Sequence, residues 1–135
     1  MGIGGQTPRK ESHTMHKTVS PFSHGLLDYA TVLATAAAPR LFAFPPKAAR
    51  LSHALSAAYL GLSATTNYPL ALMRLVPFRT HGRIEFASGF ALPLLPWIVG
   101  FARHRAARNF LVALSVITFA VWSLTDWDAG AKNEG

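Results

Sequence analysis

Residues 51–73 read LSHALSAAYLGLSATTNYPLALM, a stretch of 23 residues without a charged side chain. A helix that crosses a bilayer needs about 20 mostly apolar residues, within a range of about 17–25. A water-soluble helical bundle would instead need Lys, Glu or Gln at every third or fourth position of its exposed faces. The polar residues of this stretch are only Ser, Thr, Asn and one His. The stretch therefore favours a transmembrane helix.

Three further stretches have the same character. Residues 86–102 and 109–125 contain no charge over 17 positions each, and residues 26–44 are interrupted by Asp28 and Arg40 alone. We therefore expect an all-α integral membrane four-helix bundle. Its spans are expected at residues 24–44, 51–72, 82–102 and 108–126.

The overall composition agrees with this interpretation. Of the 135 residues, 50% are apolar and 14% are charged, against about 25% charged residues in a typical soluble domain. The chain has 13 Lys and Arg against 6 Asp and Glu, a net charge of +7. Nine of the 13 cations lie between Arg40 and Arg108, in or beside the expected loops. We therefore expect the lipid bilayer and its anionic head groups as partners, and no nucleic acid.

The chain contains no cysteine. Disulfides, thiolate metal sites and thiol redox chemistry are therefore excluded. The length allows one domain. We expect a mobile polar tail over residues 1–20, a transmembrane domain over residues 21–127, and a frayed C-terminus over residues 128–135.

An internal repeat is the most informative feature of the sequence. Residues 24–29, HGLLDY, recur as residues 81–86, HGRIEF, at an offset of 57. Residues 66–68, TNY, are matched by residues 125–127, TDW, at an offset of 59. The chain is thus expected to contain two helical hairpins, over about residues 22–73 and 79–127. Because each copy has an even number of spans, the two copies are expected to be parallel.

This pattern resembles the SPW-repeat proteins, which are small bacterial integral membrane proteins with two copies of a two-helix repeat. The resemblance covers about residues 22–127. The signature tripeptide is degenerate, because it reads Ala38-Pro39-Arg40 in the first copy and Leu95-Pro96-Trp97 in the second. The resemblance implies a bacterial inner-membrane protein with four spans, and it implies no activity.

One side of the expected bundle collects ionisable and amide side chains. Within each first helix of a hairpin, a histidine and a carboxylate are four residues apart and therefore share one face. Ionisable groups at membrane depth are rare and usually mark function. The candidate polar cluster consists of His24, Asp28, Asn67, His81, Glu85 and Asp126.

Three interpretations of this cluster remain open. In the first, the groups are structural: they lie near helix ends and hydrogen-bond across helices to set the register. In the second, they hold a ligand, bind a divalent metal such as zinc, or relay protons. In the third, His24 and His81 ligate a haem.

Stripes of small residues predict how the first two helices pack. Such stripes allow helix backbones to approach closely in lipid. The expected contact residues are Ala30, Ala34 and Ala38 on one helix and Ala57, Gly61 and Thr65 on the other. Pro93 and Pro96 lack backbone N–H groups, so we expect a kink in the third helix.

The positive charges predict the orientation only narrowly. The side with the His and acidic residues carries seven Lys and Arg, and the opposite side carries six. Charges close to the spans count most, which favours cytoplasmic loops at residues 45–50 and 103–108. Both termini and the polar cluster would then lie outside.

The sequence predicts a non-enzymatic role. The chain is small, its loops are short, and it shows no pairing of a nucleophile with a base. We expect a structural or accessory subunit of a larger membrane complex or a homo-oligomer. The alternative is a ligand-, metal- or proton-binding membrane protein that uses the polar cluster. No cofactor is expected under the first hypothesis, and zinc or haem would belong to the alternative.

Overall fold

The computed structural model describes residues 17–131, and every regular element among them is a helix. The all-α class is therefore confirmed. The elements are α1 (Pro21–Leu41), α2 (Pro46–Thr65), α3 (Phe78–Ala91), the 3₁₀ turn η1 (Leu92–Leu94), α4 (Leu95–Val99), α5 (Arg105–Leu124) and α6 (Trp127–Ala131).

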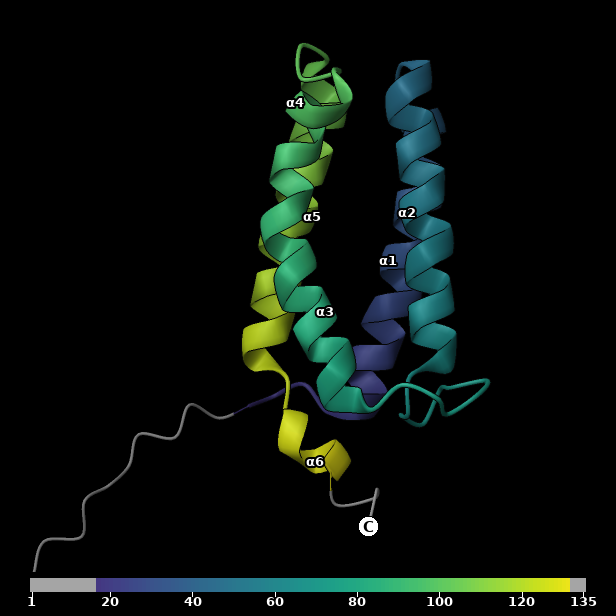
Figure 1. The fold of residues 1–135 in the computed structure, drawn as a ribbon, viewed down its shortest axis with the longest axis vertical. Helices are drawn as coiled ribbons and strands as arrows, with labels where there is room; N and C mark the ends of the chain where they lie inside the picture. The colour runs from purple at the N-terminus through teal and green to yellow at the C-terminus, as the bar shows by residue number, and fades with distance from the viewer. Residues whose placement is uncertain (1–16, 132–135) are drawn as a thin grey trace, which may run out of the picture.

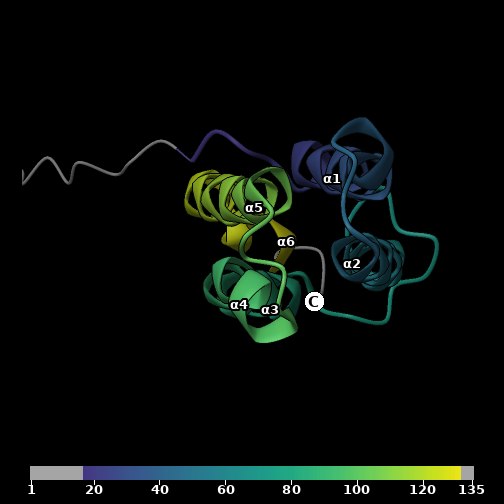
Figure 2. The ribbon, with the colours of Figure 1, turned by 90° about the horizontal axis from the view of Figure 1, so that it is seen from above.

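The long helices form two antiparallel pairs that stand side by side (Figures 1 and 2). Helix α1 packs on α2, and the segment α3–η1–α4 packs on α5. The two short loops, residues 42–45 and 100–104, lie at one end of the molecule (Figure 1). The longer connection, residues 66–77, lies at the opposite end, as does α6. The end with the two short loops is the loop end of the molecule, and the end with the longer connection and α6 is the cluster end.

The helices begin earlier than the uncharged stretches predict. Ser20 caps α1 by accepting a hydrogen bond from the backbone N–H of Ser23, and Pro46 occupies the first turn of α2. Cations such as Lys47 and Arg105 lie inside the first turns, so placing the boundaries at the last charge was wrong by several residues. Helix α2 also ends at Thr65 rather than at residue 72.

The third long segment is interrupted near its two prolines. Leu92–Leu94 form the 3₁₀ turn η1 around Pro93, and α4 begins at Leu95, next to Pro96. A proline inside a helix removes one backbone donor and displaces the preceding turn. The segment ends at Gly100, whose φ of 87° lies in the left-handed region that favours glycine.

Serines, and not the expected alanine and glycine stripes, line the contact between α1 and α2. Ser52 Oγ donates to the Thr35 carbonyl over 2.6 Å, and Ser56 Oγ donates to the Val32 carbonyl over 2.9 Å. In the second pair, Ser115 of α5 donates to a carbonyl of α3, that of Gly89, over 2.6 Å. A small residue that also donates a hydrogen bond across the interface fixes a helix pair more firmly than one that only fits.

The predicted packing stripe was therefore wrong. Ala30, Ala34, Ala57 and Gly61 are exposed, and a Cβ at Gly61 would meet no atom within 4 Å. Of the six predicted residues, Ala38 is fully buried and Thr65 is partly buried. All of these residues are small, so their spacing alone could not select the face that packs.

Residues 17–20 close the cluster end of the molecule. The backbone N–H of Val19 donates to the Leu124 carbonyl, and the N–H of Asp126 donates to the Val19 carbonyl, each over 3.0 Å. Residues 1–16 of the expected tail and residues 132–135 of the expected frayed end lie outside the described residues. Residues 128–131, also expected to fray, form α6 together with Trp127.

Candidate metal centre

Four ionisable side chains meet at the cluster end of the molecule. His24 and Asp28 lie one turn apart on α1, and His81 and Glu85 lie one turn apart on α3. Their exposed fractions are 0–3%. One ligand atom from each residue can be chosen so that all four lie within 4.8 Å of one another. The structure thus brings together both His–acid pairs that the repeat predicts.

The imidazole nitrogens and the carboxylates face a common centre. The Nε2 atoms of His24 and His81 are 3.3 Å apart. His24 Nε2 lies 3.3 Å from an oxygen of Asp28 and 3.3 Å from an oxygen of Glu85. His81 Nε2 lies 3.4 Å from Asp28 and 3.5 Å from Glu85. Each carboxylate turns one oxygen toward each imidazole.

Two threonines fix the tautomer of both histidines. The Thr125 hydroxyl donates to the Val121 carbonyl over 2.6 Å, and the Thr66 hydroxyl donates to the Leu62 carbonyl over 2.7 Å. Each hydroxyl has one proton, so toward the histidines these oxygens can only accept. His24 Nδ1 therefore donates to Thr125 over 2.9 Å, and His81 Nδ1 donates to Thr66 over 2.7 Å.

It follows that the centre contains only acceptors when both histidines are neutral. A neutral imidazole with its proton on Nδ1 has a lone pair on Nε2. Two such lone pairs and two carboxylates then face each other in a buried space. One oxygen of Glu85 has no hydrogen-bond donor within the described residues. Mutually facing acceptors repel, so the arrangement calls for a bound cation or for protons shared among the four groups.

Hydroxyl groups of the α1–α2 hairpin hold the carboxylates. The Tyr59 hydroxyl lies between Asp28 and Glu85, within hydrogen-bonding reach of both. Asp28 also accepts from Tyr68 over 3.2 Å and from Ser63 over 3.4 Å. These contacts orient the carboxylates, as outer hydrogen bonds do for ligands in metal sites.

The glycine of each His-Gly pair makes room for an aromatic ring. A Cβ at Gly25 would lie 2.7 Å from the Tyr68 ring, and a Cβ at Gly82 would lie 2.8 Å from the Trp127 ring. The Trp127 ring also packs against the His24 imidazole, with centroids 5.0 Å apart. These rings close the centre from outside, and only glycine lets them approach α1 and α3 so closely.

Of the two other predicted members of the cluster, Asp126 lies elsewhere. Asp126 accepts from the backbone N–H groups of Asp128 and Ala129, so its carboxylate caps α6 instead of joining the centre. Asn67 lies in the connection after α2, where its backbone N–H donates to the Val76 carbonyl. Including Asp126 was wrong, because a helix end that is near in sequence need not point inward, whereas the inclusion of Asn67 stays a prediction.

Sequence reasoning missed the residues that orient the four ligands. Thr66 and Thr125 were visible as the first letters of the repeated TNY and TDW motifs, but a hydroxyl carries no charge that would mark it as functional. Tyr59 has no aromatic counterpart in the second copy, where Thr118 stands at the offset of 59. No signal in the sequence pointed to it.

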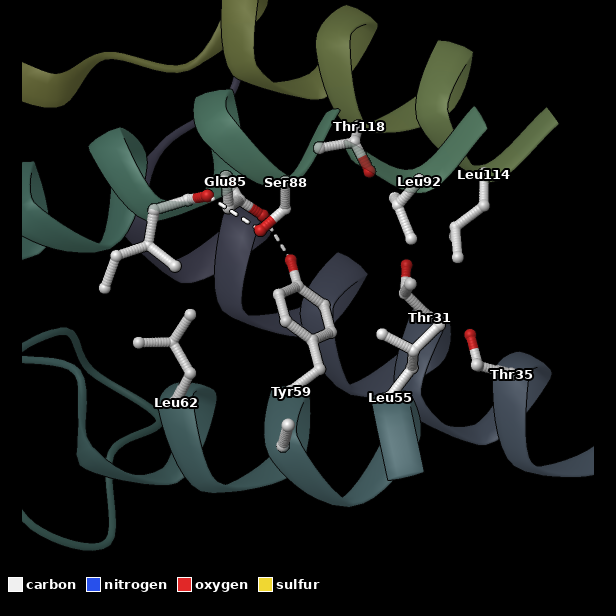
Figure 3. A pocket seen from close by; sticks show the side chains of 12 residues that line it. Thr31, Thr35, Leu55, Tyr59, Leu62, Glu85, Ser88, Leu92, Leu114 and Thr118 are labelled. Atoms are coloured by element: carbon white, nitrogen blue, oxygen red, sulfur yellow. Dashed lines mark hydrogen bonds between the residues drawn. The ribbon is translucent and has the colours of Figure 1, made fainter. Parts of the chain in front are cut away.

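A cavity of about 230 Å³ adjoins the centre, between the two helix pairs. Tyr59 and Glu85 line it at the cluster end, together with leucines from α2 and α5. Figure 3 shows the Tyr59 hydroxyl directed toward Glu85, and the side chains of Thr31, Thr35 and Thr118 around the remaining space. The cavity separates the two pairs next to the centre, and the pairs meet again toward the loop end, where Ala48 of α2 lies in one apolar core with Leu92 and Leu111.

No protein-family model, curated protein or solved structure matches the chain. The geometry of the centre therefore carries the functional argument.

Proposed function

We propose that this is a membrane-embedded protein that holds one divalent transition-metal ion, of the zinc class, between its two helical hairpins. The single observation that carries the proposal is the set of four buried acceptors of His24, Asp28, His81 and Glu85, directed at one point.

The distances suit a tetrahedral ion. Zinc forms bonds of about 2.0–2.1 Å to imidazole nitrogen and carboxylate oxygen, so tetrahedral ligands lie about 3.3–3.4 Å from one another. The nitrogen–nitrogen distance and the four nitrogen–oxygen distances, which involve both oxygens of each carboxylate, are 3.3–3.5 Å, and one ligand atom from each residue can be chosen so that all four lie within 4.8 Å. Both histidines also donate a hydrogen bond from their second nitrogen to a protein oxygen, as metal-bound histidines almost always do.

The ion would act as a clamp. Four protein ligands fill a tetrahedral shell and leave no position for a substrate, which is typical of structural sites. Two of these ligands come from α1 and two from α3, so the ion would join the hairpins at the cluster end, below the cavity and opposite the apolar core of the loop end. A haem is disfavoured, because the carboxylates occupy the space beside the imidazoles that a porphyrin would need.

The distribution of polarity supports the membrane location. Leu33, Ile98 and Val116 expose 71%, 74% and 63% of their surface, whereas the buried side chains include two histidines, two acids and several serines and threonines. A soluble monomer rarely exposes apolar patches of this extent. A membrane protein presents such side chains to lipid and keeps ionisable groups inside.

Helix α5 is the one described helix that is long and apolar enough by itself to cross a membrane. Helix α1 carries Asp28 and Arg40, α2 begins with Lys47 and Arg50, and α3 ends after 14 residues. The proposal of four spans therefore assigns the acids of α1 and α3 to the buried centre, the cations of α3 to the cluster end, and the cations of α1 and α2 to the loop end.

Pairs of equivalent contacts support the two-copy architecture, whereas the SPW-repeat resemblance stays a prediction. Ser56 bonds to Val32 in the first hairpin, and Ser115 bonds to Gly89 in the second. These residues are related by the same offsets of 59 and 57 that relate the sequence motifs. An accessory role in a larger complex or a homo-oligomer stays a prediction.

Metal analysis of the full-length protein, purified in detergent from bacterial membranes, tests the proposal. We expect about one zinc per chain, and retention of the protein in carbonate-washed membranes. Asp28→Asn and Glu85→Gln keep the side-chain shapes, and we expect each to weaken zinc binding at least about 10-fold. The control His53→Ala replaces an exposed histidine and should leave the zinc content unchanged.

Two results would contradict the proposal. Wild-type protein that is folded but takes up no zinc after reloading would favour shared protons instead of a metal. Release from the membrane by carbonate would contradict the membrane location. Membrane retention and metal content are measured independently.

A further inference from the structure

The loop end of the molecule has a charge distribution opposite to that of the cluster end. Among the described residues, all four acidic side chains, Asp28, Glu85, Asp126 and Asp128, lie in the centre or at the start of α6. The loop end carries six cations and no acid: Arg40, Lys47, Arg50, Arg103, Arg105 and Arg108. These charges have no carboxylate nearby to neutralise them.

Three of these cations line one groove between the two hairpins. The groove measures about 700 Å³ and is bordered by Lys47 and Arg50 of α2 and by Arg103 and His104 of the loop before α5. The Lys47 ammonium reaches across to this loop, where it lies 3.8 Å from the position that a Cβ at Gly100 would occupy. Both hairpins therefore contribute charge to the same space.

Every polar side chain that lines the groove is a hydrogen-bond donor. Ammonium and guanidinium groups have no acceptor. His104 Nδ1 accepts from the backbone N–H of Ala107 over 3.3 Å, so its proton lies on Nε2, which can only donate. A groove of donors alone selects a ligand whose polar atoms are all acceptors.

The start of α2, at Pro46 and Lys47, borders this groove. Ser20 caps α1 and His104 caps α5 with a side chain, but the residue that begins α2, Pro45, provides no side-chain cap. The first N–H groups of this 20-residue helix, at Lys47 and Ala48, have no partner within the helix. Free N–H groups at the positive end of a helix favour an anion.

We propose that this groove binds the phosphate of an anionic phospholipid from the leaflet that surrounds the loop end. A phosphate diester has acceptor oxygens and a negative charge, which match three cations, one imidazole donor and the start of α2. The choice of a lipid over a free anion rests on the proposed membrane location. Anionic lipids and cationic loops both mark the cytoplasmic side, so the loop end faces the cytoplasm and the metal centre lies toward the opposite face.

Lipid binding to the full-length protein, delipidated in non-ionic detergent, tests this site. Phosphatidylglycerol and phosphatidylcholine with the same acyl chains are added separately, and bound lipid is counted by native mass spectrometry. We expect one phosphatidylglycerol per chain, bound at least about 10-fold more tightly than phosphatidylcholine.

Two charge-matched double variants locate the site. K47Q/R103Q removes one cation from each side of the groove, and we expect phosphatidylglycerol to bind about 10- to 30-fold more weakly. R74Q/R83Q removes the same charge from exposed positions at the cluster end, and binding should change less than about two-fold. Unchanged zinc content in K47Q/R103Q would show that the variant folds. It would also show that zinc binding does not depend on the lipid site, so the two proposals are tested independently.

Three outcomes would overturn the assignment. Equal binding of the two lipids would show that the charge is not recognised. Equal losses in both double variants would show attraction by net charge without a site. Inorganic phosphate that binds in lipid-free detergent as tightly as phosphatidylglycerol would make a free anion the ligand.

Discussion

Replacing Thr66 or Thr125 with valine tests the metal centre without touching a ligand. Valine has the shape of threonine but offers no oxygen to the imidazole Nδ1–H, which donates over 2.7 Å to Thr66 and 2.9 Å to Thr125. The buried Nδ1–H would lose its partner, and the tautomer with the lone pair on Nε2 would no longer be favoured. Loss of such an orienting partner typically weakens metal binding 10- to 100-fold, about 1.4–2.7 kcal/mol.

The measurement is a competition for zinc between the purified protein and a chromophoric chelator. Thr65→Val is a matched control, because the Thr65 hydroxyl donates to the Gly61 carbonyl over 2.7 Å but contacts no histidine. We expect each single variant at the centre to lose about 10- to 100-fold in affinity and the control to lose less than about two-fold. The two centre variants together should lose more than either alone, because they act on different ligands.

Two results would refute the reasoning. Wild-type affinity in both Thr66→Val and Thr125→Val would mean that the threonines do not set the tautomer. An equal loss in Thr65→Val would mean that the effect comes from the end of α2 and not from the imidazole. Unfolding curves from circular dichroism would separate a loss of metal affinity from a loss of fold.

Three further predictions concern stability and pH. Gly25→Ala should destabilise the protein by about 1–3 kcal/mol because its Cβ would lie 2.7 Å from Tyr68, whereas Gly61→Ala should stabilise it by up to about 1 kcal/mol; thermal unfolding in detergent would show whether the order is reversed. Ser115→Ala removes a buried hydrogen bond between α5 and α3 and should cost about 0.5–1.5 kcal/mol in the same assay; no change would argue against the serine contact. Acidification from about pH 7.5 to about pH 5 should release zinc, because protons compete for the imidazole lone pairs, and neutralisation should restore binding; constant zinc content on dialysis would contradict a histidine site.

Much of the centre could be predicted from the repeat. A histidine and an acid four residues apart share a helix face whatever surrounds the helix. Two copies that each begin a hairpin in the same direction place His24, Asp28, His81 and Glu85 at one end of the molecule. Asp126 was misplaced by the same argument, because position at a helix end does not say which way a side chain turns.

The packing between helices could not be predicted in the same way. Ala34, Gly61, Ser52 and Ser56 are all small and lie on helices without a charged face. Periodicity therefore fits several rotations of each helix about its axis. The rotation was decided by hydrogen bonds across the interface, such as that from Ser56 to the Val32 carbonyl, which exist only once the two helices meet.

The sequence by itself determined the helical class, the His–acid pairs and the concentration of positive charge in the loops. These features depend on local spacing and composition, which are present in any arrangement of the chain. Only the tertiary structure decided that the Nδ1 atoms of the histidines donate to threonines of the opposite hairpin, so that their lone pairs converge, and that Lys47 and Arg103 share one groove. Each of these relations joins residues more than ten positions apart, and the contacts between hairpins set their distances and directions.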